Sequence, residues 1–334
     1  MITPPPIPSL YSTTNQADKI NPLDDNLWNR SDASDNVRLL ALKYRIEKVV
    51  TENQSQNVRT DVTVFDLQNN DYLYKYNQND PHFAASINKL PVSLLLLENL
   101  RNHSANLDQQ MTWLPSDVRA GDGVYDQPGA PTTAKLRDVV YDMLNHSGNT
   151  ATRVVVNGVL GGPQAVNDRL AAKPQIPQTR LDPVDATRFF FGNTTSKESL
   201  WVMEQLMKKQ DVYARFMKDA LKTNIFVDFG VRSQLAGNDY IVLVNKVGIL
   251  DDVDGNNRHD VGIIYNTKHH KAYGYSVLTT TPFSETDDSA TVQANQSLMD
   301  IGRPLLRFSG DKQTQNQLKP FSAQNIVPEK KILF

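Results

Sequence analysis

The chain contains no cysteine in its 334 residues, and several other marks of common functions are also missing. Without cysteine it can form no disulfide, bind no metal through a thiolate and use no cysteine nucleophile. Its six histidines form neither a His-x-His nor a His-x-x-x-His pattern. A Gly-x-Ser-x-Gly elbow is absent, and Gly121 and Gly123 lack the third glycine of a dinucleotide-binding loop. We therefore expect neither a metal nor a nucleotide cofactor.

Charge and hydropathy argue against two further classes of partner. The formal net charge is −2, and the basic residues are scattered, so neither nucleic acid nor an anionic membrane is predicted as a partner. No stretch approaches about 18 consecutive apolar residues, so no membrane-spanning helix is predicted. The sequence does not start with a charged segment followed by an apolar core, and we expect no signal peptide in it.

Both ends of the chain are polar. Residues 1–33 combine three consecutive prolines with many Ser, Thr, Asn and Asp residues. This composition cannot bury enough apolar surface to fold alone, and it predicts a flexible tether. Residues 306–334 are interpreted as a polar tail.

The first candidate for chemistry is the Ser-x-x-Lys pattern of Ser86 and Lys89, which precedes an apolar run typical of a buried helix. Residues three apart on a helix share a face, with Cβ atoms about 5–6 Å apart. A lysine desolvated by such a helix can take the proton of a neighbouring serine and make it a nucleophile. Alone, the pattern also fits a helix start with a surface lysine. Ser309 begins the same pattern without an apolar run, and we interpret it as a polar loop.

Two further short patterns follow in a fixed order. Ser147 and Asn149 form Ser-x-Asn, and Lys246 and Gly248 form Lys-x-Gly at the end of a β-branched run that predicts a strand. The order Ser-x-x-Lys, Ser-x-Asn, Lys-x-Gly is the one that acyl-transferring serine enzymes with Ser-x-x-Lys, Ser-Asp-Asn and Lys-Thr-Gly motifs require. On these residues the chain resembles class A β-lactamases and the wider penicillin-recognising serine hydrolases, over about residues 37–305.

The resemblance assigns a role to each motif residue. Ser86 would be the nucleophile and Lys89 its activating partner, while Ser147 would pass a proton to the leaving nitrogen. Asn149 would bind the side-chain amide of the substrate, although it also fits a helix cap. Lys246 would bring positive charge close to Ser147 and to the substrate carboxylate.

Further substrate contacts are implied on the strand that follows Lys246. The backbone N–H groups of Ser86 and Ile249 would form the oxyanion hole. Gly248 would let the substrate approach this strand closely, because it has no side chain. Tyr125 would line the entrance of the cleft, or else pack in the interior.

Several positions depart from the family pattern. Gly148 replaces the aspartate of Ser-Asp-Asn, and Val247 lacks the threonine hydroxyl of Lys-Thr-Gly, which we expect to weaken binding of the lactam carboxylate. Arg258, placed in the adjacent turn, could pair with that carboxylate or simply be solvated. Asp185 falls where the family keeps its deacylating glutamate, and its shorter side chain is expected to slow deacylation. A purely structural role of Asp185 in the loop is the alternative.

The order of predicted elements indicates an α/β fold of the α+β type. We expect an antiparallel five-stranded sheet flanked by N- and C-terminal helices, with an all-helical domain inserted from the middle of the chain. The last helix is predicted from Thr286 to about Ile301, ending at Gly302. The boundaries predicted are 34–83 with 225–305 for the sheet domain, and 84–224 for the helical domain.

The sequence thus predicts a β-lactamase-like serine hydrolase that opens the β-lactam amide through an acyl-Ser86 intermediate. A D-Ala-D-Ala peptidase, a transpeptidase or another serine hydrolase on the same fold is the second hypothesis, and a non-catalytic cell-envelope binding protein is the third. The expected partner is a small molecule, a β-lactam or a peptidoglycan-type acyl-D-amino acid, bound by a monomer. By resemblance to the family, the expected location is extracytoplasmic.

Overall fold

Strands from both halves of the chain join in one antiparallel sheet with the order β2-β1-β9-β8-β7. The computed structural model describes residues 24–29, 34–182, 192–235, 240–252, 255–282 and 289–310. The strands of the sheet are β1 (Arg59–Asp66), β2 (Asp71–Tyr76), β7 (Ile241–Asp252), β8 (Gly255–Asn266) and β9 (Lys271–Thr281). The predicted five-stranded sheet is confirmed, and β7, which carries Lys246, is one of its two edge strands.

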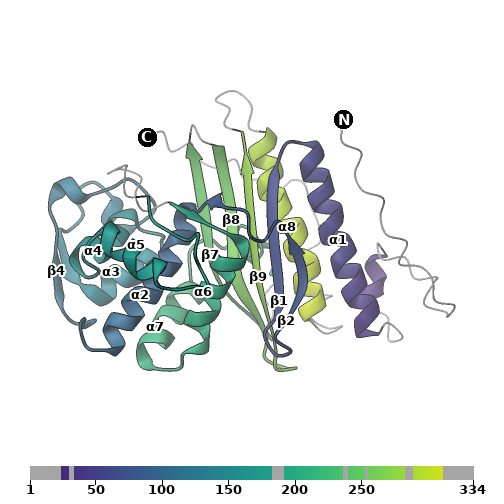
Figure 1. Cartoon of the computed structure of the whole chain (residues 1–334), viewed down its shortest axis with the longest axis horizontal. Coiled ribbons are helices and arrows are strands. Elements are labelled where there is room, and N and C mark those ends of the chain that lie inside the picture. Colours follow the sequence, from purple (N-terminus) through teal and green to yellow (C-terminus); the bar gives the residue numbers. More distant parts are fainter. Residues whose placement is uncertain are drawn as a thin grey trace.

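Helices α1 (Asp35–Ser55) and α8 (Ser289–Ser309) cover one face of the sheet, where they lie side by side (Figure 1). Ser34 starts α1, as its Oγ accepts the Val37 N–H bond at 3.4 Å. The apolar face of both helices packs on the sheet in a core that includes Leu42, Ile46 and Leu298. Burial of this face stabilises both helices more than their intrinsic propensity does.

The predicted end of the last helix at Gly302 is wrong. Helix α8 continues to Ser309 with Pro304 inside it, because Leu305 and Leu306 are buried in the core on its last turns. Gly302 permits close packing, since a Cβ atom there would lie 2.9 Å from the Val231 backbone. Residues 306–309, assigned to the tail, therefore belong to the helix. Ser309 is buried and not in a loop.

The middle of the chain packs against the other face of the sheet (Figure 1). Its helices are α2 (Lys89–Arg101), α3 (Leu136–Asn145), α4 (Asn149–Gly158), α5 (Pro163–Ala171), α6 (Ser196–Lys208) and α7 (Val212–Lys222). This region is not entirely helical, because it also contains the strands β4 (Gln110–Thr112), β5 (Thr133–Lys135) and β6 (Asn193–Thr194). The predicted domain boundaries stay a prediction.

The short turn η3 (Ala85–Asn88) connects strand β3 (His82–Phe83) with α2. Residues 89–97 of α2 are all buried, which confirms the helix predicted from the apolar run. Turn η3 lies against β7, so the start of α2 meets the edge of the sheet. Among the described helices, none is long and apolar enough to cross a membrane.

Candidate active site

Ser86 lies in η3, Lys89 begins α2, and their side chains are in contact. Lys89 Nζ donates hydrogen bonds to Ser86 Oγ at 2.6 Å and to Asn149 Oδ1 at 3.0 Å. Asn149 is the first residue of α4, and its Nδ2 donates to the Ala120 carbonyl at 2.7 Å. One buried ammonium group therefore connects the predicted nucleophile with the predicted Ser-x-Asn element.

Lys89 is buried to the degree that a proton acceptor for Ser86 requires. Only 2% of the residue is exposed, and this burial lowers the pKa of its amine to about 8. The carboxylates of Asp126, Asp122 and Asp142 act in the opposite direction and limit the decrease of the pKa. Near neutral pH a fraction of Lys89 is then neutral and can accept a proton.

Two residues of the site adopt left-handed backbone conformations, which are unusual for residues other than glycine. Ala85, directly before Ser86, has φ 45°, and Ser147 has φ 62°. A non-glycine residue in this left-handed region costs about 1–2 kcal/mol. Such strain persists only where the surrounding contacts impose it, and it is frequent at active sites.

Ser147 contacts the second buried lysine. Lys246 Nζ donates to Ser147 Oγ at 2.8 Å and to the Val247 carbonyl at 2.8 Å. It also lies 5.5 Å from the ring centroid of Phe226, a cation–π distance. Burial, and next the positive charge of Lys89, lower the pKa of Lys246 well below its usual value. The two Ser–Lys pairs lie close together, because Lys89 bonds to Asn149, two residues after Ser147, and its charge influences the pKa of Lys246.

Asp126 holds the start of α4, a role that the sequence did not reveal. Its carboxylate accepts the backbone N–H bonds of Asn149 at 2.9 Å, Thr150 at 2.8 Å and Gly123 at 3.0 Å. The first two belong to the start of α4, where a helix leaves N–H groups without a partner inside the helix. Asn149 is therefore not the cap of α4, and its side chain is available to Lys89.

The position of Asp142 explains the glycine in the Ser-x-Asn motif. A Cβ atom on Gly148 would lie 2.2 Å from Asp142 Oδ2, so no side chain fits there. Asp142 Oδ1 accepts the Val124 N–H bond at 2.7 Å, whereas its buried Oδ2 has no hydrogen-bond partner among the described residues. Burial raises the pKa of this carboxyl. A carboxylate from α3 thus occupies the space beside Gly148.

Strand β7 approaches the nucleophile turn closely at Gly248. A Cβ atom there would lie 3.0 Å from Ile87 Cγ1 and 3.3 Å from the Ala84 carbonyl oxygen, so the missing side chain serves the contact with η3. Val247 is 2% exposed, and Ile249 is half-buried on the same edge strand. Their predicted contacts with substrate stay predictions.

The structure describes the surroundings of two other predicted residues, Tyr125 and Arg258. Tyr125 is buried and packs edge-to-face against Trp113 at 5.2 Å between ring centroids, which agrees with the packing alternative.

Arg258 lies in β8 and not in a turn, because β8 begins at Gly255. It forms a bidentate ion pair with Asp251, at 2.5 Å and 3.0 Å. The guanidinium group already has a carboxylate partner within the protein.

Asp185 lies outside the described residues, so its predicted role stays a prediction. Within the ranges that the structure covers, no group of three or more His, Asp or Glu side chains could hold a metal ion. The sequence analysis did not identify three residues of the site, which are Asp126, Asp142 and Phe226. Asp126 and Phe226 reach the site from distant parts of the chain, whereas Asp142 lies six residues before Gly148; no local pattern marks any of the three.

The fold and the paired Ser–Lys contacts define a serine hydrolase of the Ser-x-x-Lys class. The sequence profile of the Beta-lactamase enzyme family matches residues 41–303. The chain belongs to this family and is a β-lactamase-like serine hydrolase. A comparison with curated proteins gives no match.

Solved structures share the fold at low sequence identity. A β-lactamase from Sphaerobacter thermophilus is 18% identical with a TM-score of 0.67, over 80% of this chain and 97% of that chain. A β-lactamase from Xanthomonas campestris is 15% identical with a TM-score of 0.69, over 82% and 99%. A mutant of PBP-A, an acyl-enzyme complex with penicillin G, is 15% identical with a TM-score of 0.65, over 78% and 96%.

Proposed function

We propose that the protein opens the amide bond of β-lactams through an acyl-enzyme on Ser86. The observation that carries this proposal is the 2.6 Å contact between Ser86 Oγ and the buried Lys89 Nζ. Neutral Lys89 accepts the Ser86 proton while Oγ forms a bond to the lactam carbonyl carbon. The carbon–nitrogen bond then breaks, and the nitrogen takes a proton from Ser147, whose Oγ regains a proton from the ammonium group of Lys246. Water finally attacks the ester carbonyl as Asp185, the proposed base, takes its proton; the ester bond to Ser86 breaks and Oγ takes back a proton from Lys89.

The buried cations suit a substrate that carries a carboxylate. Lys246 adds positive charge beside Ser147. Arg258 is a weaker candidate for this contact than the sequence suggested, because Asp251 already occupies its guanidinium group. Binding of the carboxylate is therefore assigned to Lys246 and its neighbours on β7.

A D-Ala-D-Ala peptidase or transpeptidase is the second candidate. Two observations favour it, the missing hydroxyl at Val247 and the missing aspartate at Gly148, which Asp142 excludes sterically. In this case the acyl-enzyme formed with penicillin would persist; an acyl-enzyme complex with penicillin G is described for a mutant of PBP-A. A non-catalytic binding protein is the third candidate, and the complete Ser86–Lys89 pair argues against it.

We also propose that the protein is a monomer and that it acts in an extracytoplasmic location.

Two measurements on the same sample separate these candidates. Hydrolysis of a chromogenic cephalosporin reports turnover, and intact mass after exposure to penicillin reports a stable adduct. Turnover supports a β-lactamase, a long-lived adduct without turnover supports the peptidase, and the absence of both contradicts the proposal. Peptide mapping should place the adduct on Ser86. Ser86→Ala should abolish it, whereas Ser309→Ala, in the second Ser-x-x-Lys pattern, should leave it unchanged.

A further inference from the structure

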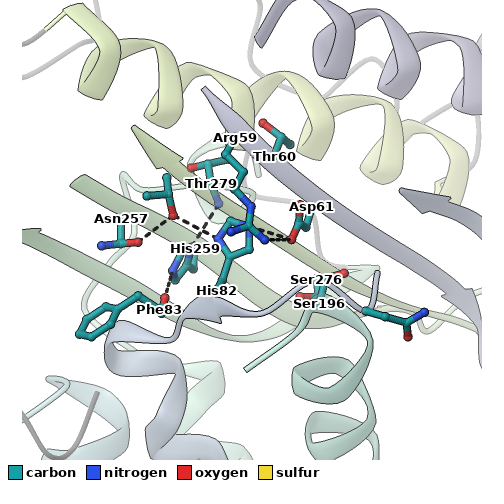
Figure 2. Close-up of polar contacts among 12 residues, drawn as sticks. Arg59, Thr60, Asp61, His82, Phe83, Ser196, Asn257, His259, Ser276 and Thr279 are labelled. Carbon is teal, nitrogen blue, oxygen red and sulfur yellow. Dashed lines mark hydrogen bonds and ion pairs between the residues drawn. The ribbon is translucent and has the colours of Figure 1, made fainter. Parts of the chain in front are cut away.

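His259 connects the central sheet with the segment that leads to the nucleophile. It lies in β8, opposite Gly248 of β7, and is completely buried. Its Nε2 atom is 2.8 Å from the carbonyl oxygen of Phe83, three residues before Ser86 (Figure 2). No motif contains His259, and the proposed mechanism does not use it.

The hydrogen bonds of His259 determine where its proton lies. The backbone N–H group of Thr279 donates to Nδ1 at 3.2 Å, so Nδ1 carries no proton. Nε2 therefore carries the proton and donates to the Phe83 carbonyl. Burial lowers the pKa of His259 to about 3, which keeps the ring neutral at physiological pH. The bond to Phe83 is consequently a fixed feature of the fold.

The residue before Phe83 is also held by the sheet. His82 Nε2 lies 2.7 Å from Asp61 Oδ2, both side chains being fully buried (Figure 2). Its Nδ1 lies 3.1 Å from Thr280 Oγ1. The rings of His82 and His259 meet edge-to-face at 5.8 Å between centroids. Two consecutive residues of β3 are thus anchored to β1, β8 and β9, immediately before the strained backbone of Ala85.

The anchored segment and β7 meet with little free space between them. A Cβ atom on Gly248 would lie 3.3 Å from His259 Cβ and 3.0 Å from Ile87 Cγ1. A displacement of Phe83 would therefore change the distance between Ser86 and the strand that carries Lys246. We propose that His259 is a positioning residue, whose bond to the Phe83 carbonyl fixes Ser86 relative to β7. The proposal rests on the proposed role of Ser86.

Two amide variants separate the hydrogen bonds of His259. In His259→Gln the amide nitrogen lies near the place of Nε2 and can still donate to Phe83, whereas the acceptor for Thr279 is lost. In His259→Asn the amide oxygen lies near the place of Nδ1 and can still accept from Thr279, whereas the donor to Phe83 is lost. Each variant thus loses one buried bond, so both should unfold at a lower temperature than the parent.

The rates of acylation by penicillin and of labelling by a fluorophosphonate are the deciding measurements. We expect His259→Gln to react within about threefold of the parent and His259→Asn to be slower by about tenfold to a hundredfold, the range for a displaced catalytic group. Ser276→Ala is the control, because Ser276 lies in β9, next to β8, and the substitution removes its buried bond to Ser199 of α6. It should lower thermal stability and leave both rates unchanged.

Equal rates for the two His259 variants would overturn the proposal, because a merely structural role affects them alike. ¹⁵N spectra of the parent should show a protonated Nε2 on His259, and the opposite tautomer would also overturn it. If penicillin fails to acylate the parent while the fluorophosphonate labels Ser86, the proposed function fails. The order of labelling rates then still decides the role of His259. A parent labelled by neither reagent contradicts both proposals.

Discussion

The side chain of Lys89 reaches both Ser86 Oγ, at 2.6 Å, and the first residue of α4, Asn149, at 3.0 Å. Its ammonium group is buried, and three carboxylates lie close enough to influence its pKa. The charge of Lys89 therefore reflects two opposing effects, burial and the attraction of Asp122, Asp126 and Asp142. The pH dependence of acylation should report the balance of these effects.

Acylation by penicillin should accelerate as the pH rises through about 8. Burial lowers the pKa of Lys89 to about 8, and only the neutral amine can accept the proton of Ser86. Below this pH the protonated fraction grows and the rate falls. Stopped-flow acylation between about pH 6 and pH 9 measures the midpoint. Lys89→Met should slow acylation by about 10²- to 10⁴-fold. A flat pH profile for the parent would contradict the role of Lys89.

Asp122→Asn should move this midpoint to lower pH. Asp122 is exposed, and its carboxylate raises the pKa of Lys89, so loss of the negative charge favours the neutral amine. The same stopped-flow titration, run in parallel on both proteins, measures the difference. Asp138→Asn is the matched control, because it removes an exposed carboxylate of α3 that does not contribute to the shift of Lys89. A midpoint that stays in place, or moves upward, would reject this account of the electrostatics.

Local patterns in the sequence predicted the parts of the site that depend on short spacing. Ser86 and Lys89 are three residues apart, so the helix start alone brings them together. Arg258 and Asp251 show why other contacts were missed: their pairing depends on the register of β7 and β8, which no local pattern reveals. Gly302 was misleading for a related reason, since tertiary burial of the last turns of α8 continues the helix beyond it to Ser309, even with Pro304 inside.

Gly248→Ala should slow acylation more than it lowers stability. The added methyl group would lie 3.0 Å from Ile87 Cγ1, so β7 and the nucleophile turn must separate by a few tenths of an ångström. We expect a loss of about 1–3 kcal/mol in the free energy of unfolding. The acylation rate should fall by about tenfold or more, as small misplacements reduce catalysis strongly.

The matched control for this substitution is Gly158→Ala, at the end of α4. There the added methyl group meets only the flexible tip of Met111, 2.8 Å away, so the rate should not change. Denaturant unfolding and acylation kinetics on all three proteins provide the comparison. If Gly248→Ala loses stability but acylates as fast as the parent, close contact between β7 and η3 is not needed for the reaction.

Asp185 should control deacylation, the step in which water hydrolyses the acyl-enzyme. Its carboxylate stands where the family has glutamate, with one methylene fewer, so the hydrolytic water is expected to be poorly positioned and the acyl-enzyme to accumulate. A chromogenic cephalosporin should then give a burst followed by slow turnover. In Asp185→Asn the burst should remain and the steady state disappear, because an amide cannot accept the proton of water. Asp185→Glu should raise the steady-state rate. Turnover by Asp185→Asn at the rate of the parent would assign the base to another group and leave Asp185 a structural role.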